Sequence, residues 1–187
     1  MKKHILIALR LSLGCILVFV VIYSLLVTLI AQAAPQQGRG ETVTHNGRVI
    51  GYRVEGQNFT AAKYFNSRPS AAGYNAAASS GSNKGTGNAA YLQLLQDRID
   101  SFLVHNPGIS KEQLPAELIT ASGSGLDPDL SPAAARVQVK RIAASRKIDE
   151  QKLYALINLH TQTPLLGILG PARINVLALN LALDSLQ

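Results

Sequence analysis

The chain begins with a long apolar run between polar flanks. Residues 11–31 carry no charge, and fourteen of these 21 residues are Leu, Ile, Val or Phe. A helix rises about 1.5 Å per residue, so 21 residues cover about 30 Å, the thickness of the hydrocarbon core of a bilayer. The pattern predicts a transmembrane helix over residues 11–34, preceded by a short segment, 1–10, and followed by one domain, 35–187.

A cleaved signal peptide is the alternative interpretation of this run. Three basic residues precede it, and Ala-Gln-Ala at 31–33 has the form of a cleavage site. The apolar part of a signal peptide is only about 7 to 15 residues long, so the length favours a retained anchor. The basic residues are Lys2, Lys3 and Arg10. Since the first charge after the run is Arg39, we expect a cytoplasmic N-terminus and an extracytoplasmic domain.

The first part of the predicted domain reads as strand and loop. An Asn-Gly pair at 46–47 lies in the middle of the segment 42–52, and this pair favours the positive φ angles of a type I′ turn, so a β-hairpin is expected. Residues 70–90 are mostly Ala, Ser, Gly and Asn, with no face that a core could cover. Their composition fits a functional loop and a flexible segment equally well.

The next part of the domain predicts helices. Asn88 is placed to cap a helix that Asn-Pro-Gly at 106–108 ends. Its apolar residues recur at helical spacing and would face the core: Leu92, Leu95, Ile99 and Phe102. Ser131 would cap a second helix with Pro132 at its first position, running to Arg146.

Asp149 would cap a third helix, which carries Leu153, Leu156, Ile157 and His160 on one face. Residues 118–120 and the pair Ile174 and Val176 indicate short strands, and 177–186 fits helix or strand, with helix favoured. The fold class expected is therefore a single N-terminal transmembrane helix followed by one mixed α+β extracytoplasmic domain.

Charge does not indicate a nucleic-acid partner. Three of the 18 basic residues lie in the first 34 positions, so residues 35–187 carry +4 of the net charge of +7. Several basic residues are expected on the solvated face of one helix: Arg136, Lys140, Arg141, Arg146 and Lys147. Cys15 lies inside the predicted span, so the domain has no disulfide and must depend on its core.

No catalytic set is recognisable. Ser-Gly-Ser-Gly at 122–125 invites a nucleotide-binding interpretation, but Pro128 stands where the third glycine of G-x-G-x-x-G belongs. Lys-Gly-Thr at 84–86 reverses the order of a phosphate-binding loop, and G-x-S-x-G is not matched at residue 122. Asp127 and Asp129 resemble a carboxylate pair for acid/base chemistry, but the dipole of the helix that follows stabilises negative charge at its N-terminus and gives a simpler explanation. We therefore expect no catalytic residue, no metal site and an unknown cofactor site.

Four runs carry a resemblance to a known family. They are Ser-Arg-Pro-Ser at 67–70, Ser-Ser-Gly-Ser-Asn at 79–83, Ser-Gly-Ser-Gly-Leu-Asp-Pro at 122–128 and Asn-Val-Leu-Ala-Leu-Asn-Leu-Ala-Leu-Asp at 175–184. In combination they resemble the C subunit of the Kdp potassium-transporting ATPase, over essentially the whole chain. The resemblance implies a non-catalytic accessory subunit in a bacterial or archaeal plasma membrane, which supports assembly and raises the ATP affinity of the catalytic subunit.

The same resemblance implies the partners: a channel-like potassium-binding A subunit, a P-type ATPase B subunit, a small F subunit and the lipid bilayer. ATP and potassium would be handled by the complex, with no cofactor held by this chain alone, and an effect on ATP affinity from outside the membrane would be indirect. An anchored ligand-binding module or enzyme is the alternative.

Small polar residues in two loops are the candidate partner contacts, because they expose backbone donors and acceptors. These candidates are Arg68, Asn75, Ser80, Ser82, Asn83, Ser122, Ser124 and Asp127. Arg68 and Asp127 are the strongest, because a charge amid Gly, Ser and Pro can make charge-assisted hydrogen bonds. The two could equally pair with each other inside the domain.

Overall fold

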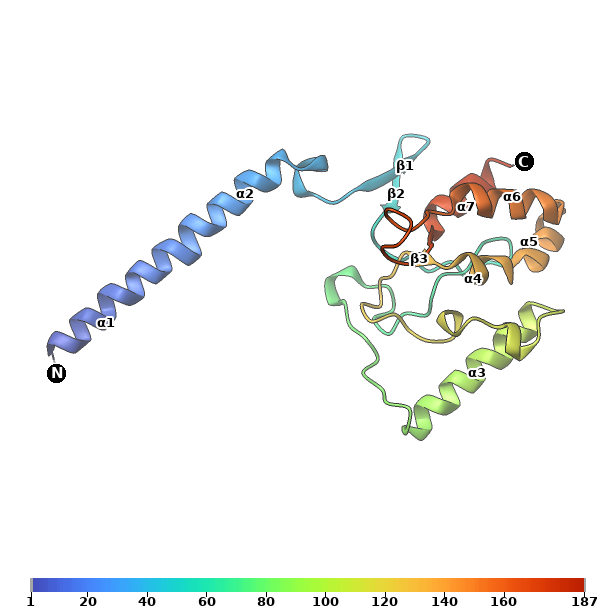
Figure 1. Cartoon of the computed structure of the whole chain (residues 1–187), viewed down its shortest axis with the longest axis horizontal. Helices are drawn as coiled ribbons and strands as arrows, with labels where there is room; N and C mark the ends of the chain where they lie inside the picture. Colours follow the sequence, from blue (N-terminus) through green and yellow to red (C-terminus); the bar gives the residue numbers. More distant parts are fainter. Residues whose placement is uncertain (1, 187) are drawn as a thin grey trace. The chain divides into compact units, whose positions relative to one another are not determined.

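The structure, a computed structural model, describes residues 2–186, and the chain divides into two units between Glu41 and Thr42. The first unit contains one continuous helix, Lys2–Ala33, shown in blue in Figure 1. It consists of α1 (Lys2–Cys15), a π-helical stretch (Ile16–Ile22) and α2 (Tyr23–Ala33). Its most apolar window has a mean hydropathy of 2.9 and no buried residue, so it is long and apolar enough to cross a membrane.

The second unit opens with the expected β-hairpin. Strands β1 (Thr42–His45) and β2 (Arg48–Tyr52) pair antiparallel around Asn46 and Gly47. These two residues have φ angles of 49° and 74°, the left-handed values that a type I′ turn requires. The hairpin prediction is confirmed.

Four helices form the core of the second unit. They are α4 (Pro132–Arg136), α5 (Val139–Arg146), α6 (Glu150–His160) and α7 (Val176–Asp184), and α6 contacts each of the other three. A short antiparallel pair, β3 (Asp129–Leu130) and β4 (Ile174–Asn175), joins this group (Figure 1). Fully buried side chains fill the core, among them Phe65, Ile142, Leu153, Ile157, Leu179 and Leu183. The prediction of a mixed helix and strand domain is thus confirmed.

Side-chain caps begin the helices where the sequence predicts them. The side chains of Asn88, Ser131 and Asp149 each accept a hydrogen bond from a backbone N–H in the first turn of their helix. The expected helix from Ser131 to Arg146 is interrupted between α4 and α5, where the buried Gln138 amide binds the backbone of Asn66. Helix is confirmed for most of 177–186, while Val176 begins α7 and does not extend the strand.

The strand expected at 118–120 is wrong. A 3₁₀ turn, Ala116–Leu118, occupies this place, started by Pro115, whose φ of −62° suits a turn. The Thr120 hydroxyl donates to the Ala116 carbonyl at 2.8 Å and closes the turn. Leu118 is buried by packing on the core and not by a sheet.

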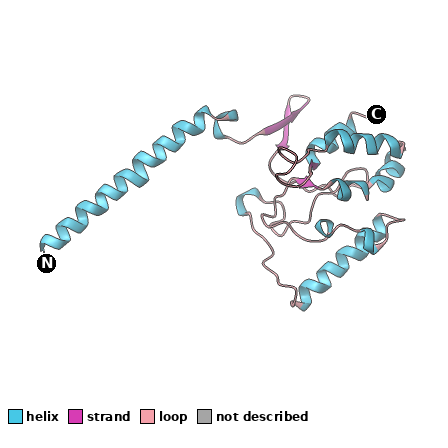
Figure 2. Cartoon of the chain, viewed as in Figure 1, coloured by secondary structure: helices cyan, strands magenta, loops and turns pink. Residues whose placement is uncertain are grey.

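Helix α3 (Ala89–His105) forms as expected, but only its C-terminal half is covered. Ile99 is buried and Phe102 packs against the core, whereas Leu92 is half exposed. The assignment of Leu92 to the core is therefore wrong. Figure 2 shows long loops, drawn in pink, running between α3 and the group α4–α7.

The expectation of a wholly solvated basic face on α5 is also wrong. Arg141 is only 8% exposed, and its guanidinium donates to acceptors on every side. It donates to Asn106 Oδ1 at 2.9 Å, Asn66 Oδ1 at 2.8 Å and Gln138 Oε1 at 2.7 Å, and to the carbonyls of Ala62 and Tyr64. Burial lowers the pKa of Arg141 to about 10, so the side chain is still charged at neutral pH.

Candidate functional site

The fold brings the two polar loops together into one site. We call residues 68–83 and 122–127 the loop cluster. Backbone and hydroxyl groups connect its halves: Ser122 N–H donates to the Pro69 carbonyl at 3.3 Å, and Ser80 N–H donates to the Ser124 carbonyl at 3.0 Å. The Ser70 hydroxyl donates to the Gly125 carbonyl at 2.6 Å. The segment up to Ser80 is therefore held to residues 122–125 by hydrogen bonds and not by apolar burial.

Glycine is required where the two halves approach most closely. Gly125 has a φ of 69°, and a Cβ atom there would lie 2.7 Å from the Ser80 carbonyl oxygen. A Cβ on Gly81 would lie 2.9 Å from the Gly123 carbonyl oxygen. Real Cβ atoms are not found at such distances, so the small residues of the cluster are explained by close backbone packing.

Arg68 and Asp127 form an ion pair across the cluster. Nη1 of Arg68 lies 2.8 Å from Oδ2 of Asp127, and the two side chains are 23% and 31% exposed. Of the two possibilities left open by the sequence, the internal pair is therefore the one that the structure contains. Arg68 Nε is buried without a hydrogen-bond partner among the described residues.

The carboxylate and the backbone of this pair are also fixed. Asp127 Oδ1 accepts from the Asp129 backbone N–H at 3.1 Å. The Tyr74 hydroxyl donates to the Arg68 carbonyl at 2.8 Å. Burial raises the pKa of Tyr74, so its hydroxyl stays protonated and keeps this bond.

The other predicted contact residues differ in burial and in hydrogen bonding. Ser122 is buried and Asn75 caps a short 3₁₀ turn, so their polar groups serve the domain itself. Ser80, Ser82 and Asn83 have side chains without a hydrogen bond to any residue in the described part of the chain, and Ser80 and Asn83 are exposed. Ser124 is exposed, and its hydroxyl accepts from the Leu126 N–H.

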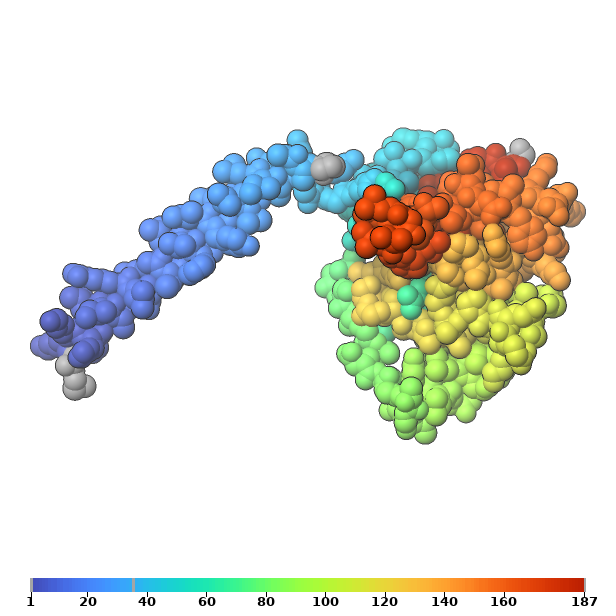
Figure 3. All heavy atoms as spheres, in the orientation of Figure 1, coloured from blue at the N-terminus to red at the C-terminus, as the bar shows by residue number. Residues whose placement is uncertain are grey.

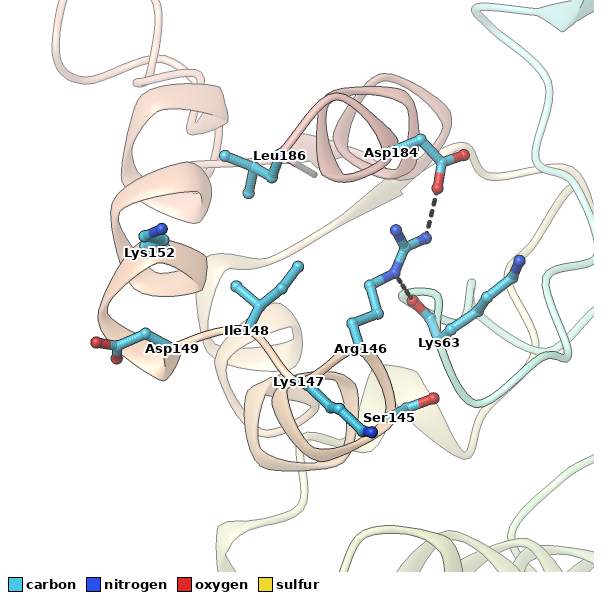
Figure 4. A pocket seen from close by; sticks show the side chains of 9 residues that line it. All are labelled: Lys63, Ser145, Arg146, Lys147, Ile148, Asp149, Lys152, Asp184 and Leu186. Atoms are coloured by element: carbon cyan, nitrogen blue, oxygen red, sulfur yellow. Dashed lines mark hydrogen bonds and ion pairs between the residues drawn. The ribbon is translucent and has the colours of Figure 1, made fainter.

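A basic pocket lies at the C-terminal end of α5 and was not foreseen from the sequence. It encloses about 510 Å³ and is shown in Figure 4. Arg146 donates to the Lys63 carbonyl at 2.8 Å and pairs with Asp184 of α7, so one cation of the pocket is already neutralised. The lining residues are Lys63, Ser145, Arg146, Lys147, Ile148, Asp149, Lys152, Asp184 and Leu186.

The excess of cations makes this pocket suited to an anionic group. Lys63 lies 82 residues or more before the other lining residues, so no local motif could have revealed it. Among residues 2–186, no group of three or more His, Cys, Asp or Glu side chains is placed to hold a metal ion.

Comparison with known proteins assigns the chain to a family. A family model described as "K+-transporting ATPase, c chain" matches residues 5–185. A potassium-transporting ATPase KdpC subunit of Flavobacterium johnsoniae is 48% identical, with 99% of this chain and 100% of that protein covered. KdpC subunits of Bacteroides fragilis (46% identical, 99% and 98% covered) and Caulobacter vibrioides (47% identical, 87% and 83% covered) are also similar. The chain therefore belongs to the KdpC family of potassium-transporting ATPase subunits.

Proposed function

We propose that the chain is a non-catalytic accessory subunit of an ATP-driven, high-affinity potassium import complex. Its helix Lys2–Ala33 anchors it in the membrane, and its domain binds the other subunits outside the cytoplasm. The channel-like A subunit, the P-type B subunit and the small F subunit are the partners proposed. The observation that carries the proposal is the loop cluster, a polar surface already ordered by its own hydrogen bonds.

A loop that is ordered before binding loses little conformational entropy when a partner docks on it. The cluster meets this condition because hydrogen bonds join its halves and an ion pair crosses it. The exposed side chains of Ser80 and Asn83, together with that of Ser124, offer donors and acceptors on this surface. Ser122 is buried and is not part of the proposed contact surface.

The chain would change the ATP affinity of the catalytic subunit only indirectly. A domain outside the membrane does not meet cytoplasmic ATP, so it can act only by binding one conformation of the complex better than another. A coupling of this kind is typically worth 1 to 3 kcal/mol, or about 5- to 150-fold in affinity. This magnitude is enough for a chaperone-like accessory role without any residue of this chain touching the nucleotide.

The orientation has its own test. Intact mass of the mature chain should include the apolar N-terminal helix, and protease added from the cytoplasmic side should leave the domain intact. A mature chain that starts near Ala34 would contradict the anchor, and cleavage of the domain from the cytoplasmic side would contradict the orientation.

Copurification tests the loop cluster. Ser80→Arg places a long cation on the exposed surface of the cluster, and Ala155→Arg places the same cation on the exposed face of α6. Both variants should keep the thermal stability of the parent, because neither side chain is buried. Ser80→Arg should lower the amount of partner subunits recovered with the chain, and Ala155→Arg should not. Equal recovery with both variants would place the contact elsewhere.

The basic pocket supports one alternative, an anchored module that binds an anionic ligand. It encloses about 510 Å³ and carries Lys63, Lys147 and Lys152 beside the paired Arg146. Saturable binding of a small anion by the chain in the absence of any partner, together with failure to copurify with pump subunits, would favour this alternative.

A further inference from the structure

Residues 164–171 form an apolar loop whose aliphatic side chains are exposed on the surface of the domain. Leu165, Leu166, Ile168 and Leu169 are 56% to 82% exposed. Figure 3 shows this segment as an orange-red knob on the surface of the domain. Residues 161–172 contain no charged side chain. Contiguous apolar surface of this kind marks a site that is covered by a partner or by a membrane.

Part of the backbone of this apolar loop is hydrogen-bonded within the loop itself. Leu165 and Leu169 exchange two N–H to carbonyl bonds of 3.0 and 2.9 Å, and the Gly167 N–H donates to the Pro164 carbonyl at 2.9 Å. The Ile168 N–H donates to the Leu165 carbonyl at 3.3 Å. Prolines, which have no N–H, begin and end the loop. Lipid can supply no hydrogen bonds, so each of these internal bonds lowers the cost of moving the loop from water into the membrane interface.

The base of the loop carries a group suited to a lipid headgroup. Gln162 and Arg173 exchange two backbone hydrogen bonds of 2.8 and 3.1 Å, which hold the two ends of the loop together. The Arg173 side chain is 60% exposed while it pairs with Asp129 at 3.2 Å. A guanidinium has five N–H groups, so donors are left for a phosphate at the level of the headgroups.

A bilayer also lies within reach of this domain. The helix Lys2–Ala33 is apolar enough to cross a membrane, and eight residues, 34–41, connect it to the second unit. Fully extended, this connection spans only about 30 Å at 3.3 to 3.6 Å per residue. The domain is thus tethered close to one leaflet, at a high effective concentration of lipid.

From these observations we propose that the apolar loop, residues 164–171, inserts into the headgroup and upper acyl region of the leaflet from which the helix Lys2–Ala33 emerges. The loop then gives the domain a second membrane contact besides its anchor, and this contact limits how far the domain can turn on its connection.

Depth-dependent quenching in nanodiscs tests the insertion with the full chain. In a Cys15→Ala background, Ile168→Cys is labelled with an environment-sensitive fluorophore, in nanodiscs of phosphatidylethanolamine and phosphatidylglycerol with or without doxyl groups on the acyl chains. The control is Val104→Cys, an apolar position on α3 that is 77% exposed. At Ile168 the emission should shift to the blue and lose intensity with doxyl lipid, and at Val104 it should do neither.

Leu166→Asp, added to the labelled Ile168→Cys chain, separates insertion from mere proximity. A charge on the loop opposes entry into lipid and should abolish the quenching, while the core keeps its packing because Leu166 is 82% exposed. Equal quenching at Ile168 and Val104, or quenching that persists with Leu166→Asp, would overturn the proposal. A blue shift that appears only with the other pump subunits, without quenching by lipid, would identify a protein as the occupant and overturn it as well.

Discussion

Replacing Arg141 should destabilise the domain more than any exposed substitution on the same helix. Its guanidinium connects three parts of the chain: the segment 62–66, Asn106 at the end of α3, and Gln138 before α5. Arg141→Met keeps the aliphatic volume and removes the donors, so no large cavity contributes to the change in stability.

The expected magnitude follows from the acceptors that lose their donor. Gln138 and Asn106 are 0% and 3% exposed, so in the folded domain their side chains depend on the guanidinium and not on solvent. Each buried unsatisfied polar group costs about 1 to 3 kcal/mol, and part of this cost is offset because the charge no longer has to be buried. We expect a net loss of about 3 kcal/mol, which lowers the melting temperature by about 10 °C at roughly 3 to 4 °C per kcal/mol.

Thermal unfolding of the full chain in detergent, followed by circular dichroism, measures this loss. Lys140→Met is the matched control, because Lys140 is the exposed neighbour of Arg141 on α5, and it should change stability by no more than about 0.5 kcal/mol. Arg141→Lys keeps the charge but cannot reach five acceptors, so its melting temperature should fall between the two. If Arg141→Met melts within experimental error of Lys140→Met, the buried guanidinium network contributes nothing and the reasoning is refuted.

Three further predictions concern the loop cluster, one partly buried carboxylate and nucleotide binding. Gly125→Ala should cost more than about 1 kcal/mol of stability, because it adds a Cβ at a positive φ and 2.7 Å from a carbonyl oxygen. Gly123→Ala has open space around the new Cβ and should be near neutral. A comparison of the two melting temperatures tests this difference. Burial raises the pKa of Asp129 above its ordinary 3.8. The contribution of this carboxyl group to the free energy of unfolding is therefore fully present below pH 3.8 and is lost as the pH rises through the raised pKa. Asp129→Asn should remove this pH dependence, which unfolding at a series of pH values would detect. The chain without partners should neither hydrolyse ATP nor bind it in the low micromolar range, because no phosphate-binding loop is complete; saturable binding by equilibrium titration would contradict the indirect role.

Local chemistry was predictable from the sequence, and long-range contacts were not. Asn88, Ser131 and Asp149 cap their helices as predicted, since a cap depends only on a side chain and on N–H groups two or three residues later. The spacing of basic residues could not reveal that Arg141 is buried, because its acceptors on Ala62 and Asn106 are 79 and 35 residues away.

The candidate site shows the same division. Composition identified the loops as polar and poor in apolar burial, but it left the ion pair between Arg68 and Asp127, 59 positions apart, as only one of two possibilities. The exposed loop 164–171 was also missed, because the sequence does not show whether its four aliphatic side chains are covered, and the structure has them 56% to 82% exposed.

The segment 64–68 physically connects the loop cluster to the helical core. The Tyr64 hydroxyl donates to Asp184 of α7, and the backbone N–H and carbonyl of Phe65 both bind the buried amide of Asn180 on the same helix. Asn66 binds α5 through Arg141, and two residues later Arg68 pairs with the second half of the cluster. Since each of these residues has a fixed partner, a subunit that docked on the cluster, as proposed above, would meet a surface continuous with the core, and its binding energy would not be spent on ordering a loop. This continuity is the property that an accessory subunit needs if it is to favour one conformation of its complex over another.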